Sequence, residues 1–230
     1  WCWKAGNGTV ENSDGTNTST VSVNQDAGFS IVSYTGTGAA MTIGHGLSVE
    51  PKLTIIKDRG ATVDWIVYTK EFDGSLDYLF LNTDAAKGDS GLTGPNSSIW
   101  NMQVASSYSN TSSRRYIAYC WHSVEGFSKF GSYVGNGNAN GPFVYLGFKP
   151  ALIICKKNGT ENWAMYDNTR STSNPNNNIL YANLTNSEGT SGVDVDFLSN
   201  GFKLRSTDGN TNSGTTTYIY MAWAETPFKY

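Results

Sequence analysis

The sequence has 230 residues, enough for one large domain or two ordinary ones with a sizeable core. Its net charge of −3 without a basic stripe argues against nucleic-acid binding, and no apolar run approaches the length of a membrane span. Charged residues make up only 15%, against roughly 25% in typical soluble domains, and Gly, Asn, Ser and Thr replace them, which favours an extracellular protein that contacts neutral polar partners such as sugars.

The chain opens on residues 1–4 (WCWK), which resemble the end of a later strand at 120–122 (CWH). This similarity predicts that residues 1–5 are the closing strand of an upstream unit and that they complete a sheet or lie against the first unit. Residues 6–19 carry almost no apolar side chains and are predicted to form a linker or a long surface loop.

Five signatures of the first half return in the same order in the second half, at offsets of 98 to 102 residues. They pair 28–38 with 126–137, 51–57 with 150–156, 64–68 with 162–166, 79–82 with 180–183, and 116–121 with 218–223. The offsets drift by only a few residues, as loop insertions between fixed strands would cause. The sequence therefore predicts two tandem units, at 20–125 and 126–230.

The apolar stretches in each unit are short and rich in Ile, Val, Tyr, Phe and Trp, without helical periodicity beyond about one turn. Residues 52–57 and 116–121 alternate or run continuously, as half-buried or sandwich-core strands do. About seven or eight such strands per unit are typical of an antiparallel sandwich or barrel. The predicted fold is all-β, with two tandem antiparallel β-sandwich-like units of about 100 residues each.

Residues for catalysis are scarce. The two histidines, His45 and His122, are replaced by other residue types in the sister copy, and neither a nucleophile elbow nor a phosphate-binding Gly loop is present. Asp194 and Asp196 would share one face of a strand, and a depolymerase using such a carboxylate pair is the enzymatic alternative. We predict a protein that binds or scaffolds, not an enzyme, and no cofactor.

The three cysteines, Cys2, Cys120 and Cys155, all lie in apolar, strand-like stretches. Buried free thiols are the favoured interpretation, and a Cys2–Cys120 disulfide is the alternative. The absence of a C-x-x-C motif or a His/Cys cluster argues against a zinc site.

The stretch from Asp208 to Asn212 carries oxygen ligands at alternating positions, on Asp208, Asn210 and Asn212, as the first half of a calcium loop does. The bidentate Glu expected further along such a loop is missing. An Asn-rich turn is therefore the competing interpretation.

Glycan binding needs an exposed aromatic face together with amide or carboxylate hydrogen-bonding groups. The sequence-based candidates are aromatic residues beside polar loops, Trp100, Tyr108 and Tyr78, with Asn101 as a hydrogen-bonding neighbour. A second set of tryptophans recurs at matched positions of the two copies and is predicted to belong to the cores. These are Trp65, Trp121, Trp163 and Trp223.

Several signatures together resemble a repeated domain family of marine tailed phages, found in virion proteins of cyanophages and pelagiphages. They are WCWKAG at 1–6, GFSIVSYTGTG at 28–38, GHGL at 44–47, PKLTIIK at 51–57, WIVY at 65–68, EGFSKFGSYVGNGNANGPFVYLGFKPALIICKK at 125–157, DFLSNGFKLR at 196–205 and YIYMAWAETPFK at 218–229. The resemblance covers nearly the whole chain from residue 28 onward. It implies a place on the virion surface, in a protein made in the host cytoplasm, and brings no catalytic motif with it.

Two functions are compatible with this sequence. The first is a tail-fibre or tail-associated module that contacts the host surface, with a glycan as the expected ligand. The second is a head fibre, a capsid decoration or an appendage spacer without a ligand of its own. In both, the expected partners are other virion proteins and upstream modules of the same chain, with neither nucleic acid nor membrane insertion. A homo-oligomer is compatible with either.

Overall fold

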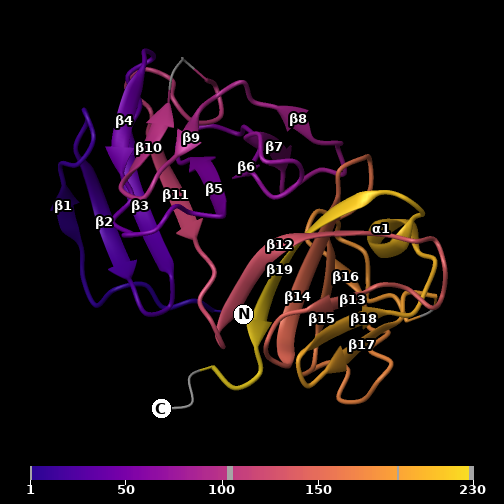
Figure 1. The fold of residues 1–230 in the computed structure, drawn as a ribbon. Helices are drawn as coiled ribbons and strands as arrows, with labels where there is room; N and C mark the ends of the chain where they lie inside the picture. Colours follow the sequence, from indigo (N-terminus) through magenta and orange to yellow (C-terminus); the bar gives the residue numbers. More distant parts are fainter. Residues whose placement is uncertain (1, 103–105, 191, 228–230) are drawn as a thin grey trace. The chain divides into compact units, whose positions relative to one another are not determined.

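The protein, in a computed structural model that describes residues 2–102, 106–190 and 192–227, is built almost entirely of antiparallel strands (Figure 1). The prediction of an all-β, sandwich-type fold is confirmed. The chain divides into two units. The first contains the described residues up to Phe80 and residues 88–122, and the second contains residues 81–87 and the described residues from Ser123 on.

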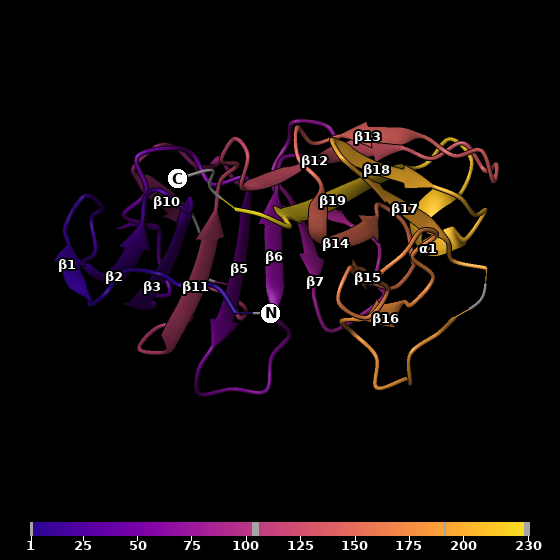
Figure 2. The same cartoon turned by 90° about the horizontal axis from the view of Figure 1, so that it is seen from below.

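The first unit has a large sheet and a small one. The large sheet has the strand order β1-β2-β3-β11-β5-β6-β7-β8, which Figure 2 shows from β1 to β7, and the small sheet has the order β4-β10-β9. The strands are β1 (Val10–Asn12), β2 (Ser19–Asn24), β3 (Phe29–Thr35), β4 (Met41–Gly44), β5 (Leu53–Asp58), β6 (Ile66–Thr69), β7 (Asp77–Phe80), β8 (Gly88–Asp89), β9 (Gly94–Pro95), β10 (Ile99–Met102) and β11 (Arg115–Trp121).

The core of the first unit lies between these two sheets. Side chains of β3, β5 and β11 alternate between the core and the other face, so that Val32, Ile56 and Ala118 are buried with Trp100 of the small sheet. Antiparallel pairing of the first and last long strands, β3 and β11, brings sequence-distant residues into one layer.

The second unit repeats the plan with fewer strands. Its sheets have the orders β12-β19-β14-β15-β16 and β13-β18-β17 (Figure 1). The elements are β12 (Ser128–Val134), β13 (Phe143–Tyr145), β14 (Pro150–Lys157), β15 (Ala164–Asp167), β16 (Leu180–Tyr181), β17 (Val195–Leu198), β18 (Gly201–Leu204), the short helix α1 (Gly209–Asn212) and β19 (Thr217–Ala224).

The two cores are built from matched residues. In the first unit Tyr34 stacks on Tyr116 with ring centroids 5.3 Å apart, and in the second Tyr133 stacks on Tyr218 at 5.2 Å. Each pair joins the first long strand of its unit to the last one, in equivalent register. The sequence repeat is therefore also a repeat of strand pairing.

The stretch before β2 departs from the sequence-based expectation. Residues 6–19, expected as a linker or surface loop, include β1, which pairs antiparallel with β2, and Asn17, which forms a parallel bridge with Ile43 of β4. Polar side chains suffice here because the backbone supplies the pairing. The described residues before β1 are not in a strand. The Trp3 ring nevertheless packs edge-on against the Trp121 ring, with ring centroids 6.2 Å apart.

The cysteines are all free thiols, but only two are buried. Burial raises the pKa of both Cys120 and Cys155 to about 12, so these thiols stay protonated and unreactive. Cys2 is exposed, which corrects the expectation of a third buried thiol. Trp3, its described apolar neighbour, lies outside the sheets, and an apolar sequence stretch alone does not bury a side chain.

Candidate functional site

Trp100, the first of the glycan-contact candidates, belongs to the core of the first unit. Its side chain is 1% exposed, and its indole Nε1 donates a hydrogen bond to Thr54 Oγ1 at 3.0 Å. Its ring packs against that of Tyr68 with centroids 4.9 Å apart. A sugar in solution cannot reach this ring, so its place beside a polar loop in the sequence was misleading.

Tyr78 and Tyr108 do come together, on either side of Phe80. The ring centroids are 5.7 Å apart for Tyr78 and Phe80 and 4.9 Å apart for Phe80 and Tyr108. Both tyrosines are half-buried, and Gly88 lies so close to the Tyr78 ring that an added Cβ would be 2.4 Å from its Cζ. Asn101 donates its amide hydrogen bond to the Gly94 carbonyl at 2.9 Å. These groups are largely occupied by packing within the unit.

The oxygen-rich stretch proposed for calcium forms a turn of helix that holds its own backbone. Asp208 is the N-cap of α1, and its Oδ1 accepts hydrogen bonds from the Asn210 backbone N–H at 2.9 Å and from its side-chain amide at 3.0 Å. Asn210 Oδ1 in turn accepts from the Asn162 N–H. The side-chain oxygens of Asp208 and Asn210 thus accept hydrogen bonds inside the fold.

Asn212 is fully buried and clamps the loop after β12. Its Oδ1 accepts from the Asn136 N–H at 2.8 Å, and its Nδ2 donates to the Asn138 carbonyl at 2.8 Å. The first unit has the same clamp, in which Asn110 accepts from the Thr37 N–H at 2.9 Å and donates to the Ala39 carbonyl at 2.7 Å. A recurring amide clamp explains this asparagine-rich turn without an ion.

Among the described residues no group of three or more His, Cys, Asp or Glu side chains is placed to hold a metal ion. His45 is fully buried, and this burial lowers its pKa. Its Nε2 lies 3.0 Å from the Asn96 carbonyl, and its Nδ1 accepts the Leu47 N–H at 3.2 Å, which fits a neutral ring. In the second unit Asp196 pairs with Arg205, Nε to Oδ2 at 2.5 Å.

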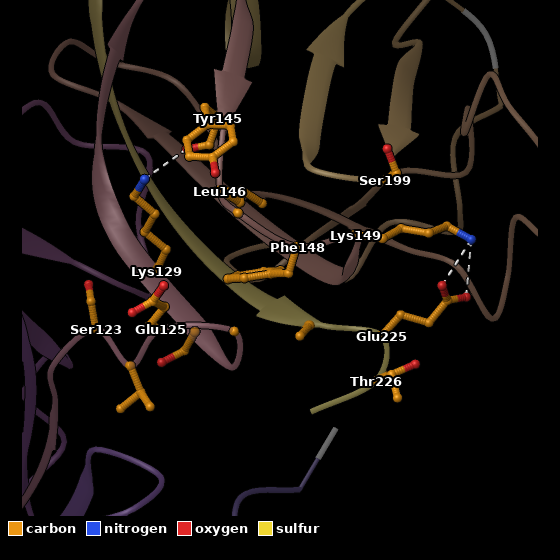
Figure 3. Close-up of a pocket in the computed structure, with 15 residues that line it drawn as sticks. Ser123, Glu125, Lys129, Tyr145, Leu146, Phe148, Lys149, Ser199, Glu225 and Thr226 are labelled. Carbon is orange, nitrogen blue, oxygen red and sulfur yellow. Dashed lines mark hydrogen bonds and ion pairs between the residues drawn. The ribbon is translucent and has the colours of Figure 1, made fainter. Parts of the chain in front are cut away.

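The second unit contains a groove of about 900 Å³ that sequence reasoning missed (Figure 3). It is formed by the start of β12, the end of β13 with the loop that follows, and the end of β19. Its lining residues are Ser123, Val124, Glu125, Gly126, Ser128, Lys129, Tyr145, Leu146, Gly147, Phe148, Lys149, Ser199, Ala224, Glu225 and Thr226.

Tyr145 is an exposed aromatic side chain of this groove, at 60%. Lys129 reaches it from β12: the ammonium lies 5.2 Å from the ring centroid and donates to the Tyr145 carbonyl at 2.9 Å (Figure 3). A cation at this distance is attracted by the electron-rich face of the ring. The contact holds the aromatic side chain beside the groove while most of its surface faces solvent.

The rest of the lining combines an apolar part with charged rims. Leu146 and Phe148 are buried and come from the loop after β13. Lys149 and Glu225 form an ion pair, Nζ to Oε2 at 2.9 Å, on a different side of the groove from Tyr145 (Figure 3). An aromatic face, an apolar patch and convergent polar groups are the chemical elements of a small-molecule site.

The corresponding position of the first unit shows why Tyr145 fits here. Gly44 ends β4 as Tyr145 ends β13, and a Cβ on Gly44 would lie 1.5 Å from Asn12 Oδ1 of the neighbouring β1. The β1–β2 hairpin thus leaves no room for a side chain. The glycine-to-tyrosine difference between copies was the available sequence signal.

Within the part of the chain that the structure describes, no helix is long and apolar enough to cross a membrane. A family model described as a domain of unknown function, DUF7483, matches residues 1–227. No curated protein matches the chain. Among solved structures, the major capsid protein P2 from bacteriophage PM2 aligns with 87% of this chain and 100% of that chain, at 10% identity and a TM-score of 0.25.

Proposed function

The chain belongs to the DUF7483 family of domains of unknown function, and we propose that it is a virion module of a tailed phage that contacts a host-surface glycan. The contact would be made through the groove of the second unit, without catalysis. The resemblance of the repeated signatures to marine tailed-phage virion proteins supports the virion location. The low charge and amide-rich composition support a neutral ligand.

The observation that carries the ligand class is Tyr145, an aromatic side chain 60% exposed at the edge of a groove of about 900 Å³. An aromatic ring can pack against the apolar C–H face of a sugar, while nearby polar groups bind its hydroxyls. Glu125 and Ser199, which line the same groove, offer such groups. Because Tyr145 ends a sheet strand, its backbone is fixed before binding, which reduces the entropic cost of binding.

The direct test is titration of the whole chain with a panel of neutral mono- and oligosaccharides, followed by calorimetry or ligand-observed NMR. Tyr145→Ala should weaken binding about tenfold, the effect of losing roughly one good contact. Phe143→Ala is the matched control, because Phe143 is 44% exposed on the same strand but outside the groove lining. Equal weakening by both variants would contradict a site at Tyr145.

The alternative function is a head fibre, capsid decoration or appendage spacer without a ligand. It is favoured if the unaltered chain binds no sugar of the panel and host cells do not retain it. Antibody labelling of this chain on intact phage particles tests the virion location separately. Labelling at a tail appendage supports host contact, labelling on the capsid supports the decoration, and no labelling contradicts both.

A further inference from the structure

Residues 81–87 occupy an unusual place in the chain. They follow β7 of the first unit, yet they belong to the second unit, where they pack against the loop between β14 and β15. The Lys87 N–H donates to the Asn158 carbonyl at 2.9 Å, and the Glu161 N–H donates to the Asp84 carbonyl at 3.0 Å. The buried Lys156 ammonium adds a bond to the same Asp84 carbonyl at 3.4 Å. The segment is held by its backbone.

Burial alternates along this segment, which starts with a turn at 81–83 and continues without regular secondary structure. Residues 81, 83, 85 and 87 are half-buried, whereas 82, 84 and 86 are exposed. Alternate burial is expected when one face of an extended segment lies on a surface.

The sequence repeat supplies a second copy of the segment. Residues 79–82 match 180–183, and the same offset places 84–87 opposite 185–188, with Gly88 opposite Gly189. In the second unit residues 184–188 are all exposed, including Leu184 at 40%. The same element is thus docked in one copy and displayed in the other.

The receiving loop is repeated as well. Residues 57–65 of the first unit correspond to 156–163, and the Arg59 N–H binds the Arg115 carbonyl just as the Asn158 N–H binds the Thr217 carbonyl. The difference is at the tryptophan that ends each loop. Trp163 is fully buried, whereas Trp65 is 36% exposed, with the Lys57 ammonium 5.9 Å from the centre of its ring.

We propose that residues 184–188 of one copy of this chain dock onto residues 57–65 of a second copy, reproducing the contact of residues 81–87 with residues 156–163. In this arrangement Glu188 takes the place of Lys87, and Arg59 takes the place of Asn158. Their backbones pair as Lys87 and Asn158 do, and their side chains have opposite charges. Leu184 supplies the apolar surface for Trp65.

This contact joins two different surfaces of the chain, so a pair of copies still offers one free surface of each kind. Such a heterologous contact propagates head to tail and does not stop at a dimer unless the ring closes. A five-residue segment makes a small interface, so the affinity between separate chains is low. The proposal is independent of glycan binding.

Sedimentation velocity of the whole chain, from micromolar to millimolar concentration, tests the proposal. The weight-average mass should rise with concentration, and Leu184→Ser or Trp65→Ala should shift that rise to about tenfold higher concentration. Val49→Ser is the matched control, because Val49 is also exposed, at 47%, but lies outside both surfaces. A mass that stays at one chain throughout, or an equal shift in the control, overturns the proposal.

A crossed charge reversal distinguishes this contact from any other self-association. Arg59→Glu and Glu188→Arg should each weaken association, and an equimolar mixture of the two variants should restore it, since each mixed pair then has one complementary contact. Glu188 also pairs with Arg170 in its own unit, Oε2 to Nη1 at 2.6 Å, so thermal unfolding must show that the variant is folded. Failure of the mixture to associate better than either variant alone contradicts the assignment of these surfaces.

Discussion

The two units share one strand plan but differ in what covers the first long strand of their larger sheet. In the first unit β2 pairs with β3, β1 pairs with β2, and the turn between β1 and β2 reaches β4 through Asn17. In the second unit, as described, β12 is the edge of its sheet. The groove at Tyr145 lies along the start of this edge strand.

This difference shows how one framework gives a closed surface and an open one. A hairpin placed on β3 requires glycine at the end of β4, because a side chain at Gly44 would overlap Asn12. Without such a hairpin the equivalent position accepts Tyr145. Among the described residues, the groove of the second unit thus lies beside an edge strand that no hairpin covers, and the change from Gly44 to Tyr145 accompanies this difference.

The largest expected difference in stability between the two units is at the equivalent positions Trp65 and Trp163. Trp163→Ala removes a fully buried indole and should reduce the free energy of unfolding by about 3–5 kcal/mol. Trp65→Ala, at a position 36% exposed, should cost less, about 1–3 kcal/mol, because part of its side chain already faces water. Chemical denaturation of both variants, followed separately for each unfolding transition, measures the contrast. Equal losses would mean that the two loops are covered alike.

The asparagine clamps should, in contrast, be equivalent. Asn110→Ala and Asn212→Ala each leave backbone groups without their partners in a buried site, at a cost of about 2–3 kcal/mol. The same denaturation experiment should show a reduced free energy of unfolding in one unit for each variant.

Adding calcium should not change the unfolding midpoint of the unaltered chain if Asp208, Asn210 and Asn212 are structural. A calcium-dependent rise in the midpoint would restore the ion-site interpretation.

The repeated strands could be predicted from sequence because their signal is local. Alternating side chains and matched offsets identify β3, β11, β14 and β19, and chain topology then decides only their order. What surrounds a strand is not local. Trp65 and Trp163 stand in nearly the same sequence context, yet Trp65 is 36% exposed and Trp163 is fully buried.

The candidate site was missed for a related reason. The sequence predicts exposed aromatic residues beside polar loops, but Trp100 lies inward on β10, while Tyr145 lies outward at the end of β13. Which face of a strand is covered depends on elements far away in the sequence. Here that element is β1, in a stretch so polar that it had the composition of a linker.

Exchanging the residues at the end of β4 and β13 tests whether the hairpin decides between glycine and tyrosine. Gly44→Tyr should destabilise the first unit by about 1–3 kcal/mol, because the hairpin must move to admit the ring. Tyr145→Gly should change the stability of the second unit by less, because its ring is 60% exposed. Hydrogen exchange at β1 and β2 should accelerate in Gly44→Tyr. Unchanged exchange there would show that the hairpin does not depend on this glycine.

The smallest expected effect concerns His45, whose equivalent in the second unit is Leu146, and it appears only in acid. Burial lowers the pKa of His45 in the folded chain below its unfolded value of about 6.5. The unfolded chain therefore binds the proton first as the pH falls, so this residue's stabilising contribution is complete above about pH 6.5 and is lost below it. His45→Leu installs the residue of the sister copy and should flatten that part of the stability curve. The measurement is the free energy of unfolding against pH for the unaltered chain and for His45→Leu. If these two curves remain parallel from pH 7 down to acid unfolding, protonation of His45 is not coupled to folding, and the two units do not differ in acid sensitivity at this position.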